Sequence, residues 1–152
     1  MDAVRSGIDQ FEAASAPVTG MLADICGEVA AAFKQAWGRG PARISARWAG
    51  SDMLILLLHD GQTEAEKTLR AAGHERQLLE ARRLLQAAVE EQLTSIVQRA
   101  TGRCVLTVLS GARLDPDLSA EIFLLGEASR GAGDDDRSPA PRPTQRLSAR
   151  DM

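Results

Sequence analysis

The chain has 152 residues, 44% of them hydrophobic and 26% charged, which is typical of a single globular domain. It has no tyrosine, three phenylalanines and two tryptophans, so it offers few aromatic side chains on which nucleic-acid bases could stack. The 18 basic and 21 acidic residues give a net charge of -3, which disfavours binding to a phosphate backbone. We therefore expect no nucleic-acid partner.

Hydropathy and cysteine content indicate the compartment. The longest apolar run, Met53 to Leu58, is far shorter than the roughly 20 residues that cross a bilayer. The opening stretch MDAVRSGIDQFEAASAP has acidic and polar residues where a signal peptide has an apolar block. Cys26 and Cys104 lie within apolar patterns, which favours buried free thiols. We expect a cytoplasmic protein that is not inserted in a membrane.

The first half of the chain predicts a helix followed by a hairpin. Residues 1–16 form a variable N-terminal segment with scattered apolar positions. A helix is predicted from near Pro17 to about Trp37, with Gly38 as its C-cap. Its apolar stripe recurs at spacings of three and four: Met21, Leu22, Ile25, Cys26, Val29, Phe33 and Trp37. Residues 43–48 alternate and residues 53–59 are apolar throughout, which predicts two antiparallel strands.

A capping box opens the second half. Thr63 and Glu66 have its spacing, which predicts a short helix to about Ala72. A long helix from about Glu75 to Ala100 is predicted next, ending at Gly102. Its core stripe is Leu78, Leu85, Val89, Leu93, Ile96 and Ala100, widened by Leu79, Leu84 and Val97.

Two more strands and a tail complete the pattern. Residues 103–109 and 118–125 predict strands separated by a loop at 110–117. Residues 127–152 contain three prolines, three consecutive aspartates and few large apolar side chains, which predicts a disordered tail. The expected domain, residues 17–126, is an α+β two-layer sandwich. Its mainly antiparallel four-stranded sheet carries two long helices, in the order α-β-β-α-α-β-β.

The sheet has more apolar surface than the helices can cover. When one face of a sheet packs on helices and the other meets water, its strands alternate, but residues 53–58 are apolar on both sides. An exposed large apolar side chain forfeits roughly 1.5–3 kcal/mol relative to full burial. We expect a second copy of the chain to cover this face as a homodimer. Alternatively, the N-terminal segment or the helix at 63–72 folds over it.

No motif for catalysis, metal binding or a cofactor stands out. The block Gly38 to Pro41 lacks the spacing and the lysine of a phosphate-binding loop, and it follows a helix. His59 and His74 have no metal-ligand spacing to each other or to the cysteines. We therefore predict no catalytic residue, metal or cofactor.

The densest carboxylate group is Asp115-Pro116-Asp117 followed by Glu121. Asp-Pro-Asp favours a turn. A second structural interpretation pairs Glu121 across the sheet with Arg43 or Arg47. Alternatively, Asp115, Asp117 and Glu121 offer oxygen ligands to a hard cation.

Four blocks resemble the MpsC-like domain of bacteria: GRGPAR at 38–43, DGQTEAEKTL at 60–69, TGR at 101–103 and LSGARLDPDLSAEIFLL at 109–125. The matching positions are Gly38, Gly40, Pro41, Glu66, Thr101, Gly102, Arg103, Asp115, Asp117, Glu121 and Phe123. The resemblance implies a link to a Na+-translocating system that generates a membrane potential and supplies inorganic carbon. It implies no catalytic mechanism.

Two functional hypotheses follow from the resemblance and the residues. The first is a non-catalytic, homodimeric accessory or regulatory domain of such a transport system, reaching the membrane through a transporter subunit. The alternative is a ligand-binding module or enzyme for a small anion or a divalent cation. Its site would lie between Arg39, Arg43 and Arg103 on one side and Asp115, Asp117 and Glu121 on the other.

Overall fold

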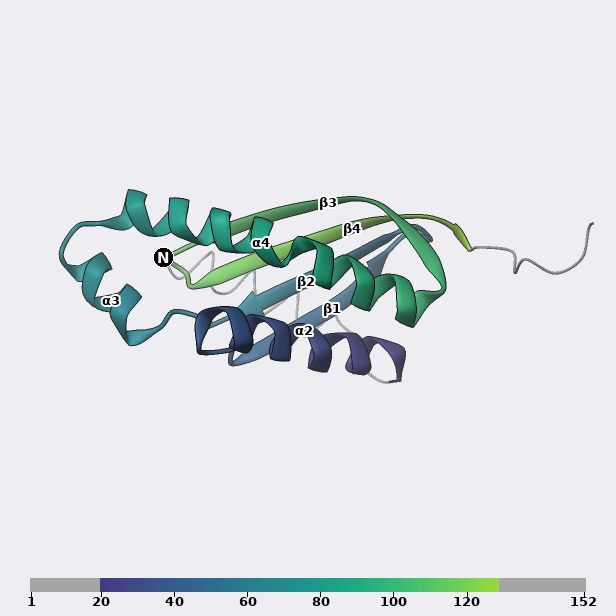
Figure 1. Cartoon of the computed structure of the whole chain (residues 1–152), viewed down its shortest axis with the longest axis horizontal. Coiled ribbons are helices and arrows are strands. Elements are labelled where there is room, and N and C mark those ends of the chain that lie inside the picture. Colours follow the sequence, from purple (N-terminus) through teal and green to yellow (C-terminus); the bar gives the residue numbers. More distant parts are fainter. Residues whose placement is uncertain (1–19, 129–152) are drawn as a thin grey trace, which may run out of the picture.

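A computed structural model of the chain describes residues 20–128, which form a sheet with two long helices on one face (Figure 1). The elements are α2 (Met21–Trp37), β1 (Arg43–Ala49), β2 (Met53–His59), α3 (Glu64–Ala71), α4 (Glu75–Thr101), β3 (Arg103–Arg113) and β4 (Leu118–Ala128). The strands lie in the order β1-β2-β4-β3, and all neighbours are antiparallel. The predicted α+β fold and element order are confirmed.

The predicted helix caps are present. α2 and α4 end at Gly38 and Gly102, whose φ angles of 77° and 65° lie in the left-handed region that glycine adopts without strain. α3 begins with the expected capping box: the Thr63 amide donates to Glu66 Oε2 at 2.7 Å, and the Glu66 amide donates to Thr63 Oγ1 at 3.2 Å. Within the described residues, α2 begins at Met21; Pro17 lies outside them.

Both strands of the second hairpin are longer than predicted. β3 continues past Leu109 to Arg113, so only residues 114–117 form the turn. The sequence around Ser110 and Gly111 lacks an apolar pattern, but these residues pair with Glu121 and Ala120 in the ladder. Residues 127–128, assigned to the tail, belong to β4. The rest of the predicted tail and the N-terminal segment lie outside the described residues.

The core lies between the helices and the inner face of the sheet. It consists of Ile25, Val29, Ala32 and Phe33 of α2, Val89, Leu93, Ile96 and Val97 of α4, and Ala46, Leu54, Leu56, Leu58, Phe123 and Leu125 of the sheet. Leu79 and Leu84 were expected to widen the α4 stripe, but they are 39% and 57% exposed. They lie off the line of the buried α4 residues, because each residue turns the helix by about 100°.

The opposite, outer face of the sheet is apolar across β2, β4 and β3. One row across the sheet runs from Arg47 through Ile55 and Ile122 to Leu109. Leu109 and Leu106 of β3 are each 62% exposed. Leu106 shares the outer face because the register shifts between Val105 and Thr107, which places it beside Gly126 of β4. α3 does not cover this face: it packs against α4, and none of its residues is buried. The other alternative cover, the N-terminal segment, lies outside the described residues.

The two cysteines are free. Cys26 is half-buried in α2, and burial raises the pKa of its thiol. Cys104, expected to be buried, is exposed. The reason is its position on the edge strand β3, where it alternates with Val105, which packs against the core.

Candidate functional site

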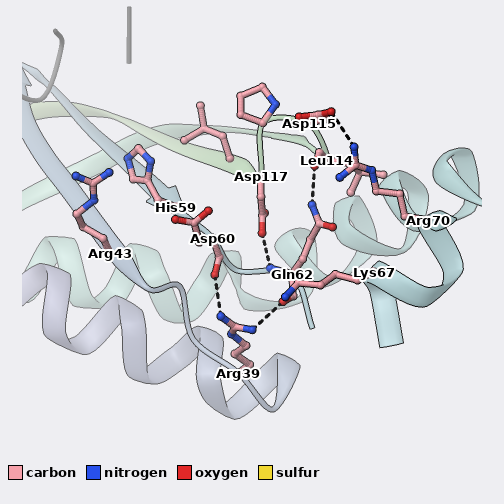
Figure 2. A pocket seen from close by; sticks show the side chains of 12 residues that line it. Arg39, Arg43, His59, Asp60, Gln62, Lys67, Arg70, Leu114, Asp115 and Asp117 are labelled. Carbon is pink, nitrogen blue, oxygen red and sulfur yellow. Dashed lines mark hydrogen bonds and ion pairs between the residues drawn. The ribbon is translucent and has the colours of Figure 1, made fainter. Parts of the chain in front are cut away.

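A polar cleft of about 380 Å³ opens at one end of the sheet, where four segments meet (Figure 2). They are the loop between α2 and β1, the exit from β2, α3, and the β3–β4 turn. The cleft is lined by Arg39, Arg43, His59, Asp60, Gln62, Lys67, Arg70, Leu114, Asp115, Pro116, Asp117 and Leu118.

The loop after α2 places Arg39 at the cleft. Its Nη1 donates to the Gln62 carbonyl oxygen at 3.1 Å, and its Nη2 donates to that of Asp60 at 3.4 Å. Asp60 has a φ of 53°, a left-handed conformation uncommon outside glycine. Gly40 lets the loop pass close to α2, since a Cβ there would lie 3.1 Å from the Ala30 carbonyl oxygen. The GRGP block therefore holds an arginine against the exit from β2.

Gln62 joins the exit from β2 to the β3–β4 turn. Its backbone amide donates to Asp117 Oδ2 at 2.7 Å, and its buried side chain donates to the Leu114 carbonyl oxygen at 2.7 Å (Figure 2). The Asp60 amide donates to the Asp117 carbonyl oxygen at 3.1 Å. In the sequence, Gln62 stands out only as part of the block at residues 60–69. Its hydrogen-bond partners, Leu114 and Asp117, lie 52 and 55 residues further along the chain, so no local sequence pattern predicts this role.

α3 adds two cations to the cleft, Lys67 and Arg70. Arg70 Nη2 lies 2.9 Å from Asp115 Oδ2, which connects α3 to the β3–β4 turn. Lys67 Nζ lies 2.7 Å from Glu64 Oε1, one turn back on the same helix. Both cations were missed by the sequence analysis, which treated this helix only through its cap.

A buried arginine of α4 contacts the acidic side chains of two segments that form the cleft, α3 and the β3–β4 turn. Arg82 of α4 binds both oxygens of Glu66, and its Nη1 lies 3.9 Å from Asp117 Oδ1. Burial favours the neutral form of Glu66, but the hydrogen bonds from Arg82 and Thr63 and the charge of Arg82 outweigh it and lower the Glu66 pKa. Glu66 thus serves both the helix cap and an ion pair.

Four of the six predicted site residues meet in the cleft: Arg39, Arg43, Asp115 and Asp117. Arg103 lies at the opposite end of β4, where it donates to the carbonyl oxygens of Ser51, Gly126 and Leu125. Its guanidinium carbon lies 6.0 Å from the ring centre of Trp48. Arg103 therefore ties β3 and β4 to the β1–β2 turn.

Glu121 lies inside the molecule, between the sheet and α4. Its carboxyl group accepts hydrogen bonds from Ser110 Oγ and from Gln86 Nε2, the latter at 2.8 Å. Burial raises its pKa to about 7, and the charge of Glu90 adds to this shift, against the opposing hydrogen bonds. The expected pairing of Glu121 with Arg43 or Arg47 is wrong, because Glu121 aligns with inner-face Leu56 whereas the arginines align with His59 and Ile55 on the outer face.

The chemistry of the cleft is that of charge recognition. Among residues 20–128, no group of three or more histidine, cysteine, aspartate or glutamate side chains is placed to hold a metal ion. None of the described helices is long and apolar enough to span a membrane. The cleft instead combines guanidinium, ammonium and carboxylate groups with backbone carbonyl oxygens.

One known family covers nearly all of the residues that form the sheet, the helices and the cleft. Residues 19–127 match the family described as Na+-translocating membrane potential-generating system (MpsC). The chain belongs to the MpsC family. Membership associates it with a Na+-translocating system that generates a membrane potential. No curated protein and no solved structure matches the chain.

Proposed function

We propose that this MpsC chain is a non-catalytic, cytoplasmic accessory or regulatory domain of a Na+-translocating, inorganic-carbon transport system, and that it works as a homodimer. Family membership supports the link to Na+ translocation. A role that depends on docking requires a surface that binds another protein, and the outer face of the sheet has the properties of one.

The outer face carries the proposal. Large apolar side chains lie on three neighbouring strands there, and Leu106 and Leu109 on β3 are each 62% exposed. Apolar patches of more than a few hundred Å² on a folded domain usually mark interaction sites. Burial against a partner would recover part of the free energy that exposure of these side chains forfeits.

The row that runs across this face from Arg47 to Leu109 favours a second copy. Arg43 and Arg47 lie at one edge of the outer face, on β1, and the exposed leucines lie at the other edge, on β3. A two-fold axis parallel to the strands, between β2 and β4, would place β1 of one copy over β3 of the other. Arg47 of one copy would then lie over Leu109 of the other, because both belong to the same row across the sheet, and its aliphatic stem would pack on leucine. Arg43 belongs to the row that ends at Arg113, at the end of the sheet, and is not part of this contact.

A reconstituted system tests the proposed role. Membrane subunits of a Na+-translocating system of this family would be placed in lipid vesicles, and the Na+-driven membrane potential would be followed with a voltage-sensitive dye. We expect the wild-type chain to change the rate at which the potential forms and Leu109→Glu to lose this effect. Leu84→Glu, which alters a similarly exposed leucine on α4, should act like the wild type. No effect of the wild-type chain, or full activity of Leu109→Glu, would contradict the proposal.

A further inference from the structure

Four cationic side chains surround the cleft: Arg39, Arg43, Lys67 and Arg70 (Figure 2). The two hydrogen bonds of Arg39 go to backbone carbonyl oxygens, which carry no formal charge. The ion pair of Arg39 with Glu64 is loose, at 4.0 Å, and the Glu64 side chain is largely exposed. The positive charge of Arg39 is therefore only weakly compensated where it faces the cleft.

Two of the three cleft carboxylates are already engaged. Asp115 pairs with Arg70 at 2.9 Å, and Asp117 accepts the Gln62 amide and lies near Arg82. The third carboxylate, that of Asp60, belongs to no group of three histidine, cysteine, aspartate or glutamate side chains that could hold a metal ion within the described part of the chain. The cleft therefore favours an anion over a divalent cation.

We propose that the cleft binds a small oxyanion with two negative charges, of the phosphate type, and that the bound anion links α3 to the rest of the domain. Guanidinium groups present several N–H donors in a plane, which suits the tetrahedral oxygens of such an anion. Lys67 and Arg70 would contact it from α3, and Arg39 from the loop after α2.

The charge of the ligand follows from the groups with which it competes. Asp115 already occupies Arg70, and Glu64 already occupies Lys67. A ligand with a single negative charge would only replace the carboxylate that already pairs with each cation, so it would gain little binding free energy. A dianion interacts more strongly with both cations at once, because the Coulomb energy grows with the product of the charges.

Such a ligand would act on the least anchored helix of the domain. α3 buries none of its residues and is held to the body by three ion pairs, Glu66–Arg82, Arg70–Asp115 and Arg70–Glu75. An element with few buried contacts opens locally at low free-energy cost. An anion that bridges α3 and Arg39 should reduce this opening.

Titration of the full chain with inorganic phosphate tests the proposal. The solution should be slightly alkaline, so that phosphate is a dianion, with sodium chloride added to keep the ionic strength constant. We expect phosphate to raise the melting temperature and to slow amide hydrogen exchange in residues 64–71. Arg70→Gln should weaken phosphate binding about tenfold, the effect of losing a charge-assisted hydrogen bond. The matched control Arg83→Gln, on an exposed face of α4, should bind like the wild type.

Asp115→Asn gives the sharpest result, because it removes the nearer of the two carboxylates that pair with Arg70, the other being that of Glu75. We expect this variant to bind phosphate more tightly than the wild type. Weaker binding by Asp115→Asn would overturn the proposal, since it would mean that the carboxylate itself contacts the ligand. No response of the wild type beyond that to chloride, or equal responses of Arg70→Gln and Arg83→Gln, would also overturn it.

Discussion

Arg82 and Glu66 form a two-point ion pair between α4 and α3. Arg82 Nε lies 2.8 Å from Glu66 Oε1, and its Nη2 lies 3.1 Å from Oε2, with the side chains only 6% and 13% exposed. Glu66 also closes the capping box with Thr63. Since no α3 residue is buried, this pair is the best-shielded attachment of the helix among the described contacts.

Arg82→Met should therefore be strongly destabilising. Removing one member of a buried ion pair leaves the other charge uncompensated, which costs about 3 kcal/mol or more. The free energy of unfolding in urea measures the loss. Arg83→Met serves as the control, because Arg83 forms an exposed pair with Glu80 on the same helix and its replacement should change stability little. Equal effects of the two substitutions would contradict the role assigned to Arg82.

The buried carboxyl group of Glu121 predicts a pH dependence of stability. Its folded-state pKa, about 7, lies above its ordinary value of 4.5, so the folded state holds the proton more tightly than the unfolded chain. Its contribution to stability is therefore complete below pH 4.5 and is lost as the pH rises through about 7. Glu66, with a lowered pKa, acts in the opposite direction and loses its contribution as the pH falls below its ordinary value.

Glu121→Gln isolates this effect. The amide side chain that it introduces cannot ionise. As the pH rises from 4.5 to about 7, the unfolding free energy of the variant should therefore increase by about 3 kcal/mol relative to that of the wild type, at about 1.4 kcal/mol per pKa unit. Urea unfolding at a series of pH values measures the difference. Parallel stability curves for the wild type and the variant would show that Glu121 does not titrate as described.

Two glycines of α2 should respond oppositely to substitution by alanine. Gly27 lies within the helix with no neighbouring atom within 4 Å of an added Cβ, so Gly27→Ala should stabilise by about 0.5–1 kcal/mol. Gly38 has a φ of 77°, so Gly38→Ala should destabilise by about 1 kcal/mol. Thermal unfolding of the two variants under identical conditions compares them, and a shift of the same sign in both would contradict the assignment of Gly38 as a left-handed cap.

The fold was largely readable from local patterns. Apolar periodicity and the caps at Gly38, Thr63 and Gly102 predicted the helices and their order. β3 was predicted too short because Ser110 and Gly111 have weak strand propensity, and their pairing with β4 is a long-range contact. Propensity within one segment does not report what lies beside it in the sheet.

The site was only partly readable, because it is assembled from distant segments. The clusters at Arg39–Arg43 and Asp115–Asp117 were found as local groups, and folding brings them together. Glu121 was misplaced although it alternates with Phe123 and Leu125, which marks it as an inner-face residue. The contribution of Gln62 depends on how the exit from β2 meets the β3–β4 turn, and those of Lys67 and Arg70 depend on how α3 packs. No local pattern of the sequence specifies either arrangement.

The central claim is that the outer face of the sheet pairs two copies of the chain, and sedimentation equilibrium of the full chain at low micromolar concentration tests it most directly. We expect a mass twice the 16.3 kDa of one chain for the wild type and for Leu84→Glu. We expect the mass of a single chain for Leu109→Glu, because its added charge would lie at the interface. A wild-type chain that sediments at 16.3 kDa, or a Leu109→Glu variant that remains a dimer, would contradict the account.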